Sequence, residues 1–211
     1  MTESIFLSAS VPDPKRAPHY AQTADTVAIT AAVGALVYVT LGRRRLVWGG
    51  HPAITPMIWV IAESMDVDYG QWVKLYQSKF FKDEFPEDND RFRNVTYTDI
   101  VDADREKSLR HMRERMFKEQ SFESAVFIGG MSGIIDEFDL FRTLQPKAQT
   151  IPVISTGGAT IDLEQKMKSL PGDLRTDLDY IALFHRHLNI TPKEKRFSQP
   201  SKQPAKLSDR I

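Results

Sequence analysis

The sequence contains no cysteine, which excludes disulfide bonds and thiolate metal sites. It also has no excess of either charge, because 28 Lys and Arg residues balance 28 Asp and Glu residues. This balance does not favour nucleic acid or a membrane as a partner. No apolar run approaches the roughly 20 residues of a membrane span, and the first residues, MTESIFLSAS, lack the pattern of a signal peptide. We therefore expect a cytoplasmic protein.

The length of 211 residues and the hydrophobic content of 41% are typical of one globular domain. We place this domain at residues 1–188. Residues 189–211 contain six basic residues, two acidic residues and three prolines, and almost nothing apolar. Such a composition predicts a basic, disordered tail.

Short apolar runs alternate with helical patterns along the chain. This alternation predicts an α/β fold, a Rossmann-like three-layer sandwich with a mainly parallel sheet flanked by helices. One or two further helices are expected to end near residue 188. The expected strands lie at about 4–10, 44–48, 72–78, 95–101, 125–128 and 150–158, and the expected helices at 23–41, 53–65, 102–120 and 132–145.

Three of the expected strands end in glycine: LVWGGHP, VFIGGMSG and VISTGG. Because the carboxyl ends of parallel strands meet at one edge, these junctions should open on the same side of the sheet. Paired glycines can expose backbone amides to an anion, since no β-carbon blocks its approach. Any single pair could instead serve only as a tight turn. For the set of three, we favour a ligand site.

Neither common phosphate-binding fingerprint is present. The sequence lacks G-x-x-x-x-G-K-[ST], and it lacks the G-x-G-x-x-G spacing of dinucleotide sites. Kinase, GTPase and ordinary dehydrogenase functions therefore lose most of their support. His185 and His187 stand two residues apart on an expected helix and face different ways, so we expect no metal site and no cofactor.

The pattern RHMRERMFKEQSFESAVFIGGMSGIIDEF, with FLSASVPDP and VWGGHPAITP upstream, resembles the SLOG superfamily of Rossmann-like nucleotide-binding domains. The resemblance covers roughly residues 4 to 160. Its members include LOG-type phosphoribohydrolases, which act on cytokinin riboside monophosphates, and DprA-like proteins. The three segments together look most like the branch found beside bacterial antiviral and nucleotide-signalling genes. LOG-type enzymes form dimers that complete the site, so the resemblance implies a homo-oligomer.

LOG-type enzymes carry an arginine on the helix before a strand, followed by P-G-G-x-G-T-x-x-E. Arg113 matches that arginine by spacing. Ile128 replaces the proline, and the Gly-Thr pair is lost. The motif fits only with a one-residue shift, so the resemblance implies a catalytic acid at Glu137 or Asp136, of which we prefer Glu137. Gly129, Gly130, Met131, Ser132 and Gly133 fill the glycine-rich segment.

Cleavage of an N-glycosidic bond passes through a cationic sugar, which a carboxylate can stabilise while an arginine holds the phosphate. Glu137 and Arg113 could supply these groups. Each also has a structural alternative: an acid is favourable near the start of a helix, and Arg113 could form an exposed ion pair with Glu106 or a neighbour. His51 follows a glycine pair, and we expect it near the ligand.

Two functions remain open at this point. The intact glycines and the altered acid motif favour a sensor of a nucleotide or nucleotide-derived molecule, such as an ADP-ribose derivative or a cyclic nucleotide. Arg113 and Glu137 leave open an enzyme, a LOG-type phosphoribohydrolase acting on nucleoside monophosphates. The expected catalytic residues are Arg113, Glu137 and Asp136, and the expected ligand-binding residues are Ser8, Ser10, Gly49, Gly50, His51, Gly129, Gly130, Met131, Ser132, Gly133, Thr156 and Gly157.

Overall fold

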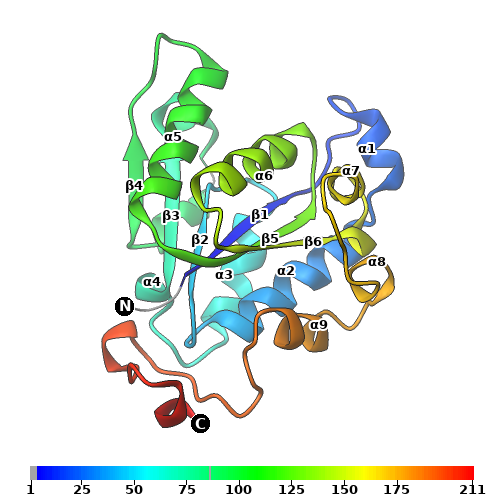
Figure 1. Ribbon diagram of the computed structural model, residues 1–211. Helices are drawn as coiled ribbons and strands as arrows, with labels where there is room; N and C mark the ends of the chain where they lie inside the picture. Colours follow the sequence, from blue (N-terminus) through cyan, green and yellow to red (C-terminus); the bar gives the residue numbers. More distant parts are fainter. Residues whose placement is uncertain (1–3, 86) are drawn as a thin grey trace.

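A computed structural model describes residues 4–85 and 87–211, so the first three residues of the expected domain lie outside the described residues. In the described chain, six strands form a parallel sheet in the order β4-β3-β2-β1-β5-β6, with helices on both faces (Figure 1). This confirms the predicted α/β Rossmann-like fold. The strands are β1 (Ser4–Ser10), β2 (Arg45–Trp48), β3 (Val73–Ser78), β4 (Val95–Thr98), β5 (Phe122–Gly129) and β6 (Gln149–Val153).

The helices form two layers, one on each face of the sheet. One layer contains α2 (Thr26–Thr40), α3 (Thr55–Glu63), α8 (Asp173–Thr176) and α9 (Tyr180–His187). The opposite layer contains α5 (Arg105–Glu119), α6 (Ser132–Leu144) and α7 (Thr160–Glu164). The short helices α1 (Pro18–Thr23) and α4 (Tyr69–Trp72) lie in the connections, as do the 3-10 turns η1 (Lys79–Glu84), η2 (Glu87–Arg91) and η3 (Ile154–Thr156).

Side chains of the central strands alternate between two cores. On β1, Ile5 and Leu7 pack toward α2, whereas Phe6 packs toward α5 and α6. The ring of Phe6 meets the rings of Phe117 and Phe141 at centroid distances of 4.8 and 5.7 Å. All of these side chains are at most 2% exposed. Burial on both faces explains why the strands read as continuous apolar runs.

Helix starts follow the capping residues. Asp25 caps α2, where its carboxylate accepts two backbone hydrogen bonds. The helix expected from residue 102 begins only at Arg105, because Asp102 and Ala103 have positive φ angles of 52° and 53°. Asp104 then caps α5 by accepting a hydrogen bond from the amide of Lys107. The cap, rather than the charged pattern, sets the boundary.

The end of the chain differs from the predicted disordered tail. Ile190 and Glu194 are 0% and 1% exposed, and the segment ends in two 3-10 turns, η4 (Pro200–Lys202) and η5 (Leu207–Arg210). The segment lies at the amino end of β2, at the end of the sheet opposite the carboxyl ends of the strands (Figure 1). Composition alone could not reveal these contacts, because the side chains that dock the segment are charged.

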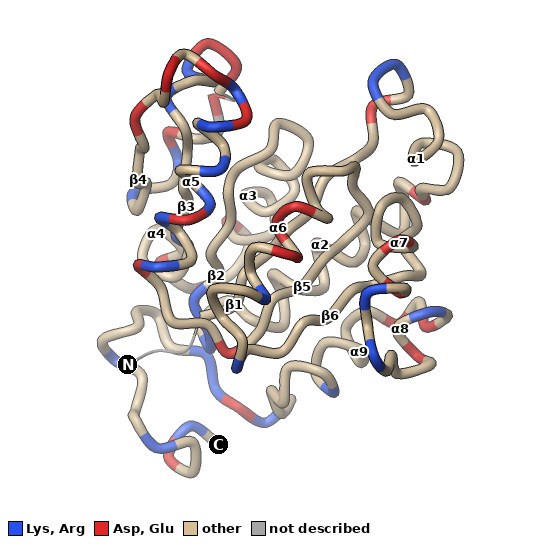
Figure 2. The backbone as a smooth tube through the Cα atoms, turned by 45° about the horizontal axis from the view of Figure 1, so that its top comes forward, with Lys and Arg blue, Asp and Glu red and all other residues tan. Residues whose placement is uncertain are grey.

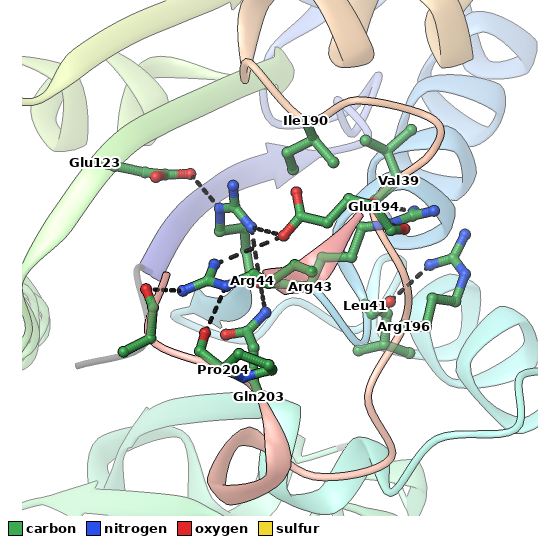
Figure 3. A network of polar contacts seen from close by, with 12 residues as sticks. Val39, Leu41, Arg43, Arg44, Glu123, Ile190, Glu194, Arg196, Gln203 and Pro204 are labelled. Carbon is green, nitrogen blue, oxygen red and sulfur yellow. Dashed lines mark hydrogen bonds and ion pairs between the residues drawn. The ribbon is translucent and has the colours of Figure 1, made fainter. Parts of the chain in front are cut away.

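An ion-pair cluster holds this segment (Figure 3). Glu194 Oε1 lies 2.7 Å from Nη1 of Arg44 and 3.6 Å from Nη1 of Arg210. Arg43 donates from Nε to the backbone oxygen of Glu194 at 2.7 Å. Burial, together with the neighbouring Arg196 guanidinium, lowers the pKa of Arg43 to about 10. The segment is thus bound to the start of β2 through buried charges.

The strand order reverses beside β1. The chain moves outward from β1 through β2 and β3 to β4, then returns to place β5 on the other side of β1. Ser10 pairs with Gly129, so the two central strands end at the same level. Ligands of open α/β sheets bind at such a reversal, outside the carboxyl ends of the strands. Among the helices in the described part of the chain, none is both long and apolar enough to cross a membrane.

Candidate functional site

A cavity of about 500 Å³ opens at this reversal. Its volume lies in the range of small-molecule sites. The carboxyl ends of β1, β2 and β3 form its floor, and α5 and the start of α6 form one wall. Most of the predicted site residues line it: Ser8, Ser10, Gly49, Gly50, His51, Arg113, Met131, Ser132, Gly133, Asp136 and Glu137.

Gly129, Gly130, Thr156 and Gly157 do not line this cavity. The amide of Gly129 donates to Thr156 Oγ1 at 2.9 Å, and the amide of Gly130 donates to the Ser10 oxygen at 2.8 Å. The amide of Gly157 is also used, by the oxygen of Ile154. These donors are therefore not free to bind an anion. The β2 and β5 junctions border the cavity, whereas the β6 junction packs behind the β5 turn.

The glycines after β5 make a turn that larger residues could not make. Gly129 and Gly130 have φ angles of 61° and 81°. A β-carbon on Gly130 would lie 1.9 Å from Cδ1 of Ile134, a residue in the first turn of α6. The turn therefore sets where α6 begins.

Three elements bring a charged cluster to the cavity wall. Arg113 of α5 donates from Nε to Glu137 Oε1 at 3.0 Å, and Ser8 of β1 donates from Oγ to Glu137 Oε2 at 2.5 Å. Arg113 also donates from Nη2 to the oxygen of Gly133 at 3.3 Å. Arg113 is 8% exposed and the Glu137 side chain 16%. Both carboxylate oxygens of Glu137 thus accept a hydrogen bond from the protein.

The two candidate acids have different environments. Asp136 Oδ2 lies 3.8 Å from Nη1 of Arg113, and its side chain is 62% exposed. Glu137 is closer to Arg113 and largely buried. The ion pair of Arg113 therefore favours Glu137 over Asp136 as the acid fixed in the site. Arg113 thus pairs with Glu137 and Asp136, whereas Glu106 pairs with Arg105.

The start of α6 faces the cavity without a side-chain cap. Met131 occupies the capping position and accepts no side-chain hydrogen bond there. The first amides of a helix have no partner within the helix, and the helix dipole gives this end a partial positive charge. Ser132 and Gly133, in the first turn, line the cavity. This end of the cavity is suited to an anionic group of a ligand.

His51 lies in the loop after β2, on the cavity wall. Its Nδ1 accepts a hydrogen bond from the amide of Ala53 at 3.2 Å, which leaves the proton of the neutral ring on Nε2. Burial, and then the charge of Arg16, lower the pKa of His51 below 6.5. At neutral pH the ring is a neutral donor near the guanidinium of Arg16.

The cavity contains more acidic than basic side chains. Figure 2 shows acidic residues on α6 and mixed charges along α5 and beside β4. Arg105 and Arg113 are each paired with a carboxylate, whereas Arg16 is exposed and has no ion-pair partner among the described residues. The lining acids are Asp13, Glu84, Glu106, Asp136 and Glu137, and the lining bases are Arg16, Arg105 and Arg113.

Several lining residues were missed from the sequence. Gln77 at the end of β3 and Phe81 in η1 line the cavity, as do Arg16 and Arg105. Gln77 could have been found by the rule that located the glycine junctions, since it is a polar residue at the carboxyl end of an expected strand. The loops that carry Arg16 and Arg105 give no such signal. In residues 4–85 and 87–211, no group of three or more His, Asp or Glu side chains could hold a metal ion.

The fold and the cavity define a Rossmann-like α/β domain with a cavity of small-molecule size at its switch point. The chain belongs to the SLOG cluster3 family, whose model matches residues 19–188. SLOG membership, predicted from the glycine and acid motif, is thereby confirmed, and it indicates a nucleotide-related ligand. The antiviral branch stays a prediction. No curated protein and no solved structure gives a significant match.

Proposed function

We propose that the cavity binds a nucleotide-derived small molecule and that the protein is a sensor in a defence or signalling system. The observation that carries this proposal is the anchored pair of Arg113 and Glu137 beside the uncapped start of α6, on the wall of a 500 Å³ cavity. An anionic group of the ligand lies at the start of α6, and the sugar lies over the ends of β1 and β2. An ADP-ribose derivative or a cyclic nucleotide has these parts.

The charge of the wall supports a ligand with few negative charges. Acidic side chains outnumber basic ones, and two of the three arginines already have carboxylate partners. A polyphosphate would meet repulsion from these acids in a partly enclosed site. Nucleoside monophosphates or cyclic nucleotides should therefore bind more tightly than triphosphates.

The state of Glu137 favours a binding site over an enzyme. Its two oxygens accept hydrogen bonds from Ser8 and Arg113, so the carboxylate is held as an acceptor that orients Arg113. A LOG-type phosphoribohydrolase is the second candidate. It is favoured by the same contact, because a carboxylate and an arginine at the ligand could stabilise a cationic sugar and its phosphate.

One experiment separates the two functions. Purified protein is incubated with adenosine, guanosine, cytidine and uridine 5′-monophosphates, and free base is measured by chromatography while thermal unfolding is followed in parallel. A sensor gives a higher Tm with at least one nucleotide and no base release. An enzyme gives base release that Glu137→Gln abolishes. If no nucleotide releases base or raises the Tm, both proposals are wrong.

A sensor also needs a response to its ligand. We propose that occupancy changes the assembly of a cytoplasmic homo-oligomer, as the resemblance to LOG-type dimers suggests. Light scattering of the protein with and without the stabilising nucleotide measures this response. An unchanged mass in both states would argue against assembly as the output.

A further inference from the structure

Gln77 is a buried polar side chain with no hydrogen-bond partner among the described residues. On β3, the alternation of side chains places Val73, Leu75 and Gln77 on one face. Val73 and Leu75 belong to the apolar core, and Gln77 is the first polar residue of this row, at the end of the strand. It is 6% exposed and lines the cavity. Its position thus points a carboxamide toward the ligand site.

The carboxamide makes no hydrogen bond with any described residue. Because Gln77 lines the cavity, its amide donor and carbonyl acceptor are open to a ligand there. The acids and arginines of the opposite wall satisfy one another, as in the contacts of Glu137 with Ser8 and Arg113. Gln77 therefore stands out as an unused donor and acceptor inside the cavity.

Gly50 makes room for this side chain. A β-carbon on Gly50 would lie 2.2 Å from Nε2 and 2.9 Å from Cδ of Gln77. Gly50 also has a φ of 73°, so the loop after β2 bends over the end of β3. The amide of Gln77 is held against this loop, next to His51.

The distance across the sheet fits a nucleotide. The strand order β3-β2-β1-β5 separates the end of β3 from the end of β5 by about 14 Å, at about 4.8 Å per strand. A nucleoside monophosphate carries its phosphate and its base at opposite ends of the sugar. A phosphate at the start of α6 therefore leaves the base near Gln77, in a cavity that Phe81, Leu109 and Met112 also line with apolar side chains.

We propose that Gln77 recognises the hydrogen-bonding edge of the nucleobase. A carboxamide presents a donor and an acceptor side by side, and nucleobase edges present the complementary pair. This inference rests on the proposed binding of a nucleotide. Beyond that function, the inference specifies which end of the cavity holds the base and which residue sets the preference among bases.

The test compares ligands with and without a base. The Kd values of wild type and Gln77→Met are measured by calorimetry for the four nucleoside 5′-monophosphates and for ribose 5-phosphate. We expect Gln77→Met to raise the Kd of the preferred nucleotide about 5- to 30-fold, because one or two hydrogen bonds are lost. Ribose 5-phosphate should bind both proteins within about twofold, since it has no group that reaches Gln77.

Gln71→Met is the matched control. Gln71 is exposed and donates to Asp68, away from the cavity, so its substitution should leave every Kd unchanged. Gln77→Glu keeps the shape of the side chain but removes the donor, and it should change the order of preference among the bases. This second variant keeps the test usable if Gln77→Met unfolds.

The outcomes distinguish this inference from the function on which it rests. If wild type binds a nucleotide and Gln77→Met binds it equally well, base recognition by Gln77 is wrong while the proposed function stands. An equal loss for the nucleotide and for ribose 5-phosphate would also refute it, because that loss does not depend on the base. If wild type binds none of these ligands, both proposals fail.

Discussion

Arg113 carries a buried positive charge whose partners in the described chain lie on α6. Glu137, Gly133 and Asp136 approach three of its nitrogen atoms at 3.0, 3.3 and 3.8 Å. Gly133 allows this approach, since a β-carbon there would lie 3.1 Å from Nη2 of Arg113. One side chain thus joins α5 to the start of α6 and fixes the acid of the site.

Replacing Arg113 with alanine should destabilise the protein by about 2 kcal/mol, because Glu137 would keep a largely buried charge without its cation. Urea unfolding measures the loss. Arg110→Ala is the control on the same helix, since the Arg110 side chain is 63% exposed and pairs only with Glu114 among the described residues. It should change stability by less than about 0.5 kcal/mol. Equal effects of the two substitutions would contradict the role of Arg113.

His51 should make stability depend on pH in the acidic range. Its pKa in the folded protein is below the 6.5 of the unfolded chain, so the unfolded state binds the proton more readily. The free energy of unfolding should therefore fall as the pH drops below about 6.5. His51→Gln should reduce this fall, which urea unfolding at pH 7.5 and 5.5 would measure. The same pH dependence in both proteins would rule out His51 as its source.

The turn between β5 and α6 positions the helix that begins at the cavity. Gly130→Ala would place a β-carbon 1.9 Å from Ile134 at a φ of 81°. We expect a loss of about 1–3 kcal/mol in unfolding free energy. Gly172→Ala is a matched control, because nothing lies within 4 Å of its β-carbon position and its φ is −62°. Similar melting temperatures for the two variants would contradict a structural role for this turn.

Periodicity and capping residues predict the elements of this fold well. Strands buried on both faces give continuous apolar runs, and Asp25 marks the start of α2. The positive φ angles of Asp102 and Ala103 leave no comparable trace in the sequence, so the start of α5 was placed too early. Two helices at most were expected after β6, whereas α7, α8 and α9 are all present because short helices have little periodicity to detect.

The site was predicted where a strand ends in glycine next to the helix that follows it. Gly49, Gly50 and the residues from Met131 to Gly133 line the cavity. The hydrogen-bond partners of Gly129 and Gly130 depend on how distant segments pack, and no local pattern could reveal that their amides are used. Gln77 reaches the cavity only because β3 lies next to β2 in the folded sheet.

At the scale of the whole molecule, the carboxyl-terminal segment packs against the amino ends of β2 and β3, at the end of the sheet opposite the cavity. Trp72 donates from Nε1 to the oxygen of Phe197 at 2.9 Å, and Phe197 donates its amide to the oxygen of Gly42 at 2.8 Å. Together with the Glu194 cluster, which Figure 3 shows, these contacts tie residues 194–210 to the starts of β2 and β3. The cavity and the docked segment thus lie at opposite ends of the strands.

Glu194→Gln should therefore lower the free energy of unfolding by about 3 kcal/mol, because Arg44 and Arg210 would lose a buried counter-charge. Urea unfolding measures this loss, and limited proteolysis should show faster cleavage after residue 189. Asp209→Asn, an exposed acid of the same segment, should leave both unchanged. Wild-type stability and protease resistance in Glu194→Gln would mean that the cluster does not hold the segment.

The central claim is that a nucleotide binds across the carboxyl ends of β5, β1, β2 and β3. Titration of the ¹⁵N-labelled protein with the four nucleoside 5′-monophosphates, followed by amide NMR, tests it most directly. The account predicts saturable shifts at Gly49, Gly50, Ser132 and Gly133, with no shift at Gly172, which does not line the cavity. Shifts confined to other regions, or none at millimolar nucleotide, would contradict it.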